Sequence, residues 1–325
     1  MTSNHSPLQV LCLIISLAAV ILTTLVAFSN LGRQYGFQEA IPGLLRSNLE
    51  AVSNKQPSPI SPPAWINCAW GIILIWQVLW CVHGIVSIFR TSYGVPVYTN
   101  PVLLSPIMLL LFMFACGLNV SWFILYDRMY TSTSCLFIFL TTATTWATYA
   151  SALSSMNYNI YRLKKSRMYL EICLSRVLVQ NGLAAYAMWG VFVLAFNVSV
   201  AVIYNKETHV TNAVSTVIGA SIIGCVQIFY FLLDVSCLDS FARYIMTPYI
   251  VPIVVLASCM FRQELWVSTD ITFILLASLL SFAFLSFMMK GACMAFKIIR
   301  NNSGGGDITT SGPTSPVDES YHLLK

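Results

Sequence analysis

Apolar residues occur along the chain in long runs, and short polar segments separate one run from the next. A helix that crosses the hydrocarbon core of a bilayer needs about 20 mainly apolar residues, because unpaired backbone groups are costly there. Eight stretches meet or approach that length: Leu8–Phe28, Ala64–Phe89, Val102–Tyr126, Thr133–Ser155, Val177–Tyr204, Ala213–Leu233, Ile245–Phe261 and Ile271–Met289. The pattern predicts an all-α, polytopic membrane helix bundle with about eight transmembrane helices.

The seventh stretch leaves the number of spans open. It is shorter than the others and contains Pro248 and Pro252, which remove backbone donors and break the first turns of a helix. Seven spans are therefore the main alternative. The first stretch has no basic segment before it and no small-residue cleavage site after it, so we interpret it as a retained helix rather than a signal peptide.

Composition supports the membrane assignment and excludes one class of partner. Hydrophobic residues make up 57% of the 325 residues and charged residues only 9%, which is more apolar surface than a soluble domain of this size hides. The net charge of +5 comes from basic residues at the ends of apolar stretches. We therefore expect no nucleic-acid partner.

The distribution of Lys and Arg predicts the orientation. With eight spans, eleven of the 17 Lys and Arg residues fall on the side of the N-terminus and six on the other side. Cytoplasmic segments are enriched in these residues, so both termini are predicted to be cytoplasmic. The loop 31–61 is then extracytoplasmic. We expect a plasma or endolysosomal membrane rather than a mitochondrial one.

No chemical motif in the sequence indicates a reaction. The ten cysteines are scattered, without a C-x-x-C pair or a cluster in a loop, which disfavours both a metal site and disulfides. The sequence also lacks a phosphate loop, a zinc pattern and a Ser-His-Asp constellation. We therefore expect no metal, no cofactor and no enzymatic activity.

Polar and aromatic residues recur together inside the third and the fifth predicted helices. Asn119, Trp122 and Tyr126 are spaced so that they share one helix face. In the fifth predicted helix, Tyr186, Trp189 and Asn197 fall within an arc of about 80°. Amides in hydrocarbon usually face the bundle. Two interpretations follow: hydrogen bonds that hold helices together, or an aromatic pocket for a large apolar molecule.

A family resemblance rests on four short motifs that occur in order. They are Pro62, Pro63 and Trp65; Trp70 and Gly71; Leu118, Asn119 and Trp122 with Tyr126 nearby; and Tyr186, Trp189 and Asn197. Trp146, which follows two threonines, is similar as well. In these residues the chain resembles the translocator protein or tryptophan-rich sensory protein family, although Leu74 stands where that family usually has tyrosine.

The resemblance implies a five-helix membrane domain over residues 1–205, with 31–61 as a lid loop. Three additional transmembrane helices over 206–299 would make the chain an extended eukaryotic branch of the family, followed by a disordered cytoplasmic tail over 300–325. The implied function is binding, and in some members translocation, of a large hydrophobic ligand, a porphyrin or a sterol. The implied ligand-binding residues are Trp65, Trp70, Asn119, Trp122, Tyr126, Trp146, Tyr186, Trp189 and Asn197. Val202, Tyr204 and Lys206 fit a proposed sterol-contact pattern.

Two other functions stay open at this point. A seven-helix signalling receptor would need an N-terminus outside the cell, and a tetrapyrrole-degrading membrane enzyme would destroy bound porphyrin in light. Membrane lipid is an expected partner in every case. The sequence leaves a homodimer open.

The tail after Arg300 is polar and rich in Gly, Ser, Thr and Pro, a composition typical of disorder. Glu319, Tyr321, Leu323 and Leu324 fit acidic-dileucine and tyrosine-based sorting signals that cytosolic adaptors bind. Changing Leu323 and Leu324 to Ala is expected to move a tagged protein toward the cell surface. Surface biotinylation measures this redistribution, and an unchanged surface fraction would exclude the sorting signal.

Overall fold

The computed structural model describes residues 5–92, 94–204, 210–236, 239–261 and 271–303, and these residues are almost entirely helical. Two compact units are distinguished, Met1–Phe287 and Met288–Lys325. Seven described helices are long and apolar enough to cross a membrane. The expectation of an all-α, polytopic helix bundle is therefore confirmed.

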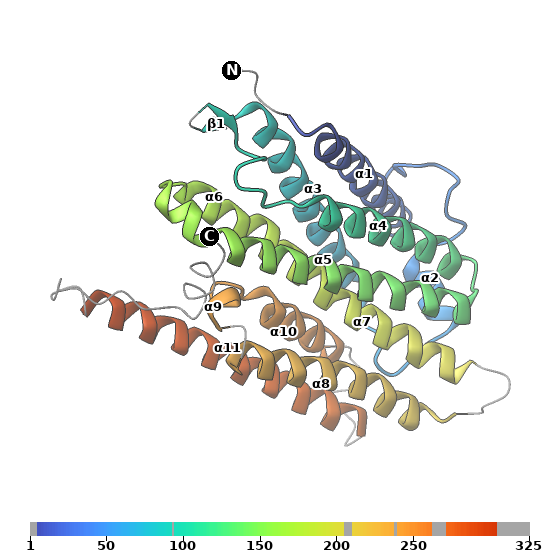
Figure 1. Cartoon of the computed structure of the whole chain (residues 1–325). Coiled ribbons are helices and arrows are strands. Elements are labelled where there is room, and N and C mark those ends of the chain that lie inside the picture. The colour runs from blue at the N-terminus through green and yellow to red at the C-terminus, as the bar shows by residue number, and fades with distance from the viewer. Residues whose placement is uncertain (1–4, 93, 205–209, 237–238, 262–270, 304–325) are drawn as a thin grey trace. The chain divides into compact units, whose positions relative to one another are not determined.

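Figure 1 shows the helices in chain order. Their bounds are α1 (Pro7–Tyr35), α2 (Leu49–Lys55), the 3-10 helix η1 (Ala64–Ile66), α3 (Asn67–Phe89), α4 (Pro106–Asp127), α5 (Thr131–Lys165), α6 (Tyr169–Leu174), the π-helix η2 (Ser175–Gln180), α7 (Asn181–Ile203), α8 (Asn212–Ser236), α9 (Asp239–Ala242), α10 (Thr247–Met260) and α11 (Ile271–Ser303). Between α3 and α4, strands β1 (Thr91–Ser92) and β2 (Val95–Pro96) pair antiparallel.

Helix α10 corresponds to the seventh predicted span and is shorter than the helices of the other predicted spans. It has 14 residues, which at 1.5 Å each reach about 21 Å, less than the roughly 30 Å of a bilayer core. Pro248 lies at its start and Pro252 inside it. Asn181 holds its first turn, because the Asn181 Oδ1 accepts hydrogen bonds from the backbone N–H groups of Met246 at 3.0 Å and Thr247 at 3.4 Å. The eight apolar stretches thus correspond to seven long helices and one short one.

Helix α7 lies at the centre of the unit Met1–Phe287, in contact with α3, α5, α8 and α10. Every residue from Asn181 to Phe192 is buried. A helix that is apolar all round is typical of a position surrounded by other helices, whereas α1 and α3 leave one side exposed. The exposed apolar side chains of these outer helices include Ile14, Leu22, Ile72 and Leu79.

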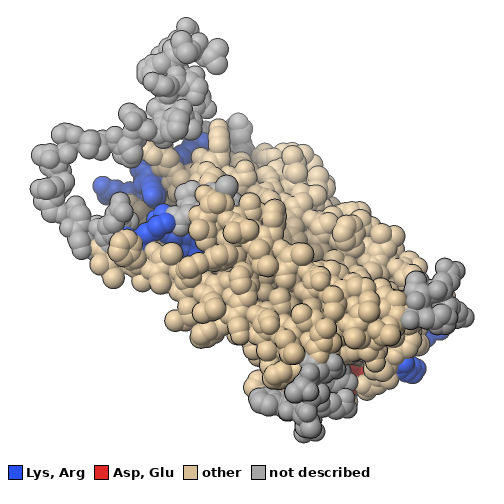
Figure 2. Space-filling model, turned by 90° about the horizontal axis from the view of Figure 1, so that it is seen from below, with Lys and Arg blue, Asp and Glu red and all other residues tan. Residues whose placement is uncertain are grey.

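The surface of the molecule carries few charges over a broad area. Figure 2 shows a face that is largely free of acidic and basic side chains, with Lys and Arg gathered at its margins. Apolar side chains in contact with lipid and charges at the membrane boundary account for this distribution. The protein is therefore an integral, multi-pass membrane protein.

Small residues allow the helices around α7 to approach closely. A Cβ atom at Gly190 would lie 2.8 Å from the Oγ1 atom of Thr142 on α5. A Cβ atom at Gly219 of α8 would lie 2.5 Å from the Ser199 Oγ on α7. Without a strong hydrophobic force between helices in lipid, such close packing is a main source of helix association.

Replacing Gly190 with Val is expected to push α5 away from α7. Overpacking of this kind costs about 1–3 kcal/mol, and the free energy of unfolding in mixed detergent micelles should fall by that amount. Gly117 of α4 is the matched control, because nothing lies within 4 Å of a Cβ atom built there and the residue is exposed. Equal stability losses for Gly190→Val and Gly117→Val would contradict the packing described here.

Candidate functional site

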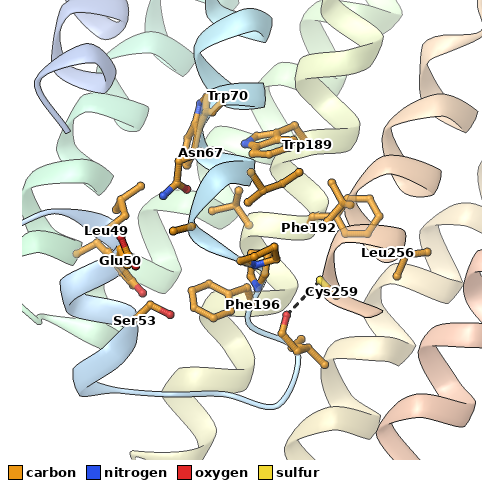
Figure 3. Close-up of a pocket in the computed structure, with 18 of the residues that line it drawn as sticks. Leu49, Glu50, Ser53, Asn67, Trp70, Trp189, Phe192, Phe196, Leu256 and Cys259 are labelled. Atoms are coloured by element: carbon orange, nitrogen blue, oxygen red, sulfur yellow. Dashed lines mark hydrogen bonds between the residues drawn. The ribbon is translucent and has the colours of Figure 1, made fainter. Parts of the chain in front are cut away.

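A cavity of about 260 Å³ lies beside the buried helix α7. Its walls come from α2, η1, α3, α4, α7 and α10, with single residues from α8 and α11 (Figure 3). All of these lining residues belong to the unit Met1–Phe287. Most of them are aromatic or aliphatic, so the cavity suits an apolar occupant.

Helix α7 provides one wall through four residues of a single face. Trp189, Phe192, Val193 and Phe196 all line the cavity, and their spacing of three, four and seven residues places them one above another on the helix. Figure 3 shows Trp189, Phe192 and Phe196 on the same side of α7.

Three indole and phenol rings from α3 and α4 stack into the inner wall. The ring centroids of Trp70 and Trp122 are 4.9 Å apart, and those of Trp122 and Tyr126 are 5.4 Å apart. Trp189 joins them from α7, with its ring centroid 5.9 Å from that of Trp70. Such offset contacts stabilise the rings against one another beyond simple burial. The wall is therefore pre-formed.

Several polar groups of this wall lack a hydrogen-bond partner among the described residues. They are the Nε1 atoms of Trp70 and Trp189 and the hydroxyl of Tyr126. All three side chains are buried and line the cavity. A buried donor without a partner costs about 1–3 kcal/mol. A bound molecule with acceptor atoms would remove that cost.

One ring of the wall, that of Trp122, is held in place by a hydrogen bond on the side away from the cavity. The Trp122 Nε1 donates a hydrogen bond of 3.2 Å to the Asn197 Oδ1, and the Asn197 Nδ2 donates to the Val193 carbonyl at 2.7 Å. Asn197 is fully buried and does not line the cavity. Its amide therefore fixes the orientation of Trp122 rather than contacting an occupant.

Helix α2 covers the cavity on the side of the loop between α1 and α3. Leu49, Glu50, Ser53 and Asn54 line it from this short helix, and Pro62, Pro63 and Ala64 follow at the start of η1. Figure 3 shows Leu49, Glu50 and Ser53 directed from α2 toward the cavity.

Side chains at the ends of α1 and α4 hold the loop before α2. The carboxylate of Asp127 accepts hydrogen bonds from the backbone N–H of Arg46 at 2.8 Å and of Ser47 at 2.7 Å. The Asn30 Oδ1 accepts one from the N–H of Leu49 at 2.7 Å. Since Asp127 and Asn30 are both buried, these contacts fix the position of α2.

The helices beyond residue 205 complete the opposite wall. Val255, Leu256 and Cys259 line the cavity from α10, Ile223 from α8 and Leu276 from α11. The Cys259 Sγ also lies 3.6 Å from the carbonyl oxygen of Ile60, to which it donates a hydrogen bond. The C-terminal helices are thus part of the cavity and also contact its loop.

Four of the ligand-binding residues proposed from the sequence line this cavity: Trp70, Trp122, Tyr126 and Trp189. Asn119, Tyr186 and Asn197 are buried and do not line the cavity. Trp65 is 51% exposed and does not line the cavity.

Trp146 belongs to a separate cluster of rings between α5, α8 and α10. It packs against Tyr149 and Tyr230 with ring centroids 5.8 Å from each. The hydroxyls of Tyr149 and Tyr230 are 3.1 Å apart, and the Tyr249 hydroxyl donates to the Asp234 carboxylate at 2.5 Å. This cluster is a buried polar contact between helices and does not line the cavity.

The remaining proposed residues lie elsewhere or outside the described part of the chain. Val202 is half-buried, and the Tyr204 hydroxyl donates a hydrogen bond of 3.2 Å to the carbonyl of Pro57 in the loop before η1. Lys206 and the sorting residues Glu319, Tyr321, Leu323 and Leu324 lie outside the described residues.

Sequence reasoning missed lining residues on α7, on α2 and on the C-terminal helices. Phe192 and Phe196 lie three and seven residues after Trp189. Helical periodicity could therefore have placed them on the same face as Trp189. Glu50 and Ser53 lie in a short polar segment whose position depends on contacts with Asp127 and Asn30, and no local pattern indicates it. Within the described residues, no group of three or more His, Cys, Asp or Glu is placed to hold a metal ion.

No protein-family model, curated protein or solved structure matches the chain.

Replacing Asp127 with Ala is expected to release the loop before α2. Hydrogen bonds to a charged acceptor contribute about 1.5–3 kcal/mol, so amide hydrogen exchange at Arg46 and Ser47 should accelerate by about tenfold or more. Asp127→Asn keeps one acceptor oxygen and should give an intermediate rate. Exchange that is unchanged in both variants would show that the carboxylate does not hold the loop.

Proposed function

We propose that the protein binds a large, mainly apolar molecule in the cavity between α2, α3, α4, α7 and α10. The observation that carries this proposal is the pairing of an apolar cavity with unpartnered donors on Trp70, Trp189 and Tyr126. Three such donors on one cavity wall suit an occupant that accepts hydrogen bonds.

The size of the cavity bears on how a ligand binds. Its volume of about 260 Å³ is near the lower end of the roughly 300–1,000 Å³ of pockets for drug-sized ligands. A whole porphyrin or sterol therefore requires α2 and its loop to shift outward. The hydrogen bonds of Asp127 and Asn30 to the loop are the contacts that such a shift would strain, which supports a lid role for residues 31–61.

The resemblance to the translocator protein family supports the same site. The motif residues Trp70, Trp122 and Trp189 come from three separate helices and line one cavity. We propose that the chain is a distant, extended relative. Its extra helices do more than lengthen the bundle, because α10 supplies part of the wall.

The orientation and the membrane belong to the same proposal. With α10 counted as an eighth crossing, the distribution of Lys and Arg puts both termini on the cytoplasmic side, and α2 with its loop lies on the extracytoplasmic side. The ligand would then reach the cavity from that side of a plasma or endolysosomal membrane.

Binding is expected to quench the tryptophan fluorescence of the purified protein. A porphyrin dimethyl ester and a fluorescent sterol are the probes, titrated against the protein in nanodiscs. Replacing Trp189 with Phe should weaken saturable binding by about tenfold, since one indole donor and its contact area are lost. Trp146→Phe is the matched control, because Trp146 lies in the separate cluster.

The proposal fails if neither probe quenches saturably. It also fails if Trp189→Phe and Trp146→Phe change the affinity equally. Thermal unfolding of both variants checks that a loss of affinity does not reflect a loss of fold.

A further inference from the structure

The charges around the cavity are distributed unevenly. Among the described residues that line it, Glu50 is the only one with a charged side chain at neutral pH, and Lys, Arg and His are absent. Arg33, at the end of α1, pairs with another carboxylate, since its Nε lies 2.8 Å from that of Glu39. The described lining residues therefore contribute one negative charge and no cation.

Glu50 stands in the first turn of α2, where the helix dipole favours a carboxylate. Asn48 caps this helix by accepting a hydrogen bond of 2.7 Å from the N–H of Ala51. The described residues form no salt bridge with Glu50, and Figure 3 shows it beside Ser53 on the cavity side of α2.

The aromatic wall of the cavity, in contrast to Glu50, offers hydrogen-bond donors. The N–H groups of Trp70 and Trp189 are donors only, and the Tyr126 hydroxyl donates as well as accepts. These groups lack partners in the described part of the chain. They suit an uncharged acceptor such as a carbonyl or ether oxygen. An ionised carboxylate buried there would have no cation to compensate its lost hydration.

We infer that the ligand carries no negative charge and has an acceptor atom at its buried end, and that Glu50 excludes anionic molecules at the side covered by α2. This inference rests on the proposed function and narrows its ligand class. If a porphyrin with free carboxylates binds with these groups toward α2, the Glu50 carboxylate repels them. If it binds with them toward the aromatic wall, they lose their hydration and no cation replaces it. A sterol or an esterified porphyrin has no carboxylate, so neither the repulsion by Glu50 nor the loss of carboxylate hydration applies to it.

A matched pair of probes tests the inference. A porphyrin diacid and its dimethyl ester share one ring system and differ by two negative charges. In wild type the ester should bind about tenfold more tightly than the diacid, since like charges a few Å apart near a protein surface repel on that scale. Fluorescence quenching in nanodiscs measures both affinities.

The Glu50→Gln variant removes the charge and keeps the size of the side chain. It should reduce the preference for the ester several-fold, chiefly by tightening binding of the diacid. Glu39→Gln is the control, because Glu39 lies in the same loop but does not line the cavity. Partition of the ester into lipid is common to all three proteins, so the change in the ratio between proteins is the decisive quantity.

The outcomes separate the two proposals. Ester and diacid bound equally by wild type, or an unchanged ratio in Glu50→Gln, would overturn the charge selection and leave ligand binding intact. Absence of saturable binding by either porphyrin and by a sterol would overturn ligand binding itself. A neutral sterol and its 3-sulfate form a second pair that needs no variant, and tighter binding of the sulfate would also refute the inference.

Discussion

The burial of α7 on every side is the constraint on which the rest of the structure depends. Its small residues, such as Gly182 and Gly190, let the rings and hydroxyls of neighbouring helices come within van der Waals distance. Its large residues, Trp189, Phe192 and Phe196, lie together on the face that lines the cavity. One helix therefore both brings its neighbours together and keeps one place between them open, because bulky rings cannot fill that space completely.

The loop between α1 and α3 is held by a different kind of interaction. A carboxylate on α4 and an amide on α1 accept hydrogen bonds from loop backbone groups. A rigid aromatic wall facing a hydrogen-bonded cover is a suitable arrangement for a site that admits a bulky molecule. The C-terminal helices add a further wall, so residues 1–205 alone would leave the cavity incomplete.

Much of the fold follows from the sequence, because long apolar runs have few alternatives in a bilayer. The convergence of Trp122, Tyr126 and Trp189 was also accessible, since helical periodicity places such residues on inward faces, whereas Trp70 was proposed from the family resemblance. Trp65 and Trp146 are also tryptophans, yet Trp65 is largely exposed and Trp146 packs in a separate cluster of rings. The position of α2 and its Glu50 depends on contacts across more than 70 residues of sequence, and no local pattern encodes such contacts.

Photo-crosslinking in nanodiscs with a sterol that carries a diazirine group tests the central claim most directly. If the cavity is the binding site, mass spectrometry will find adducts within Leu49–Asn54 and Trp189–Phe196, and an excess of unlabelled sterol will remove them. Adducts spread over exposed apolar side chains such as Ile72 and Phe114, and unaffected by competition, would show that the sterol contacts only the outer surface and would contradict the account.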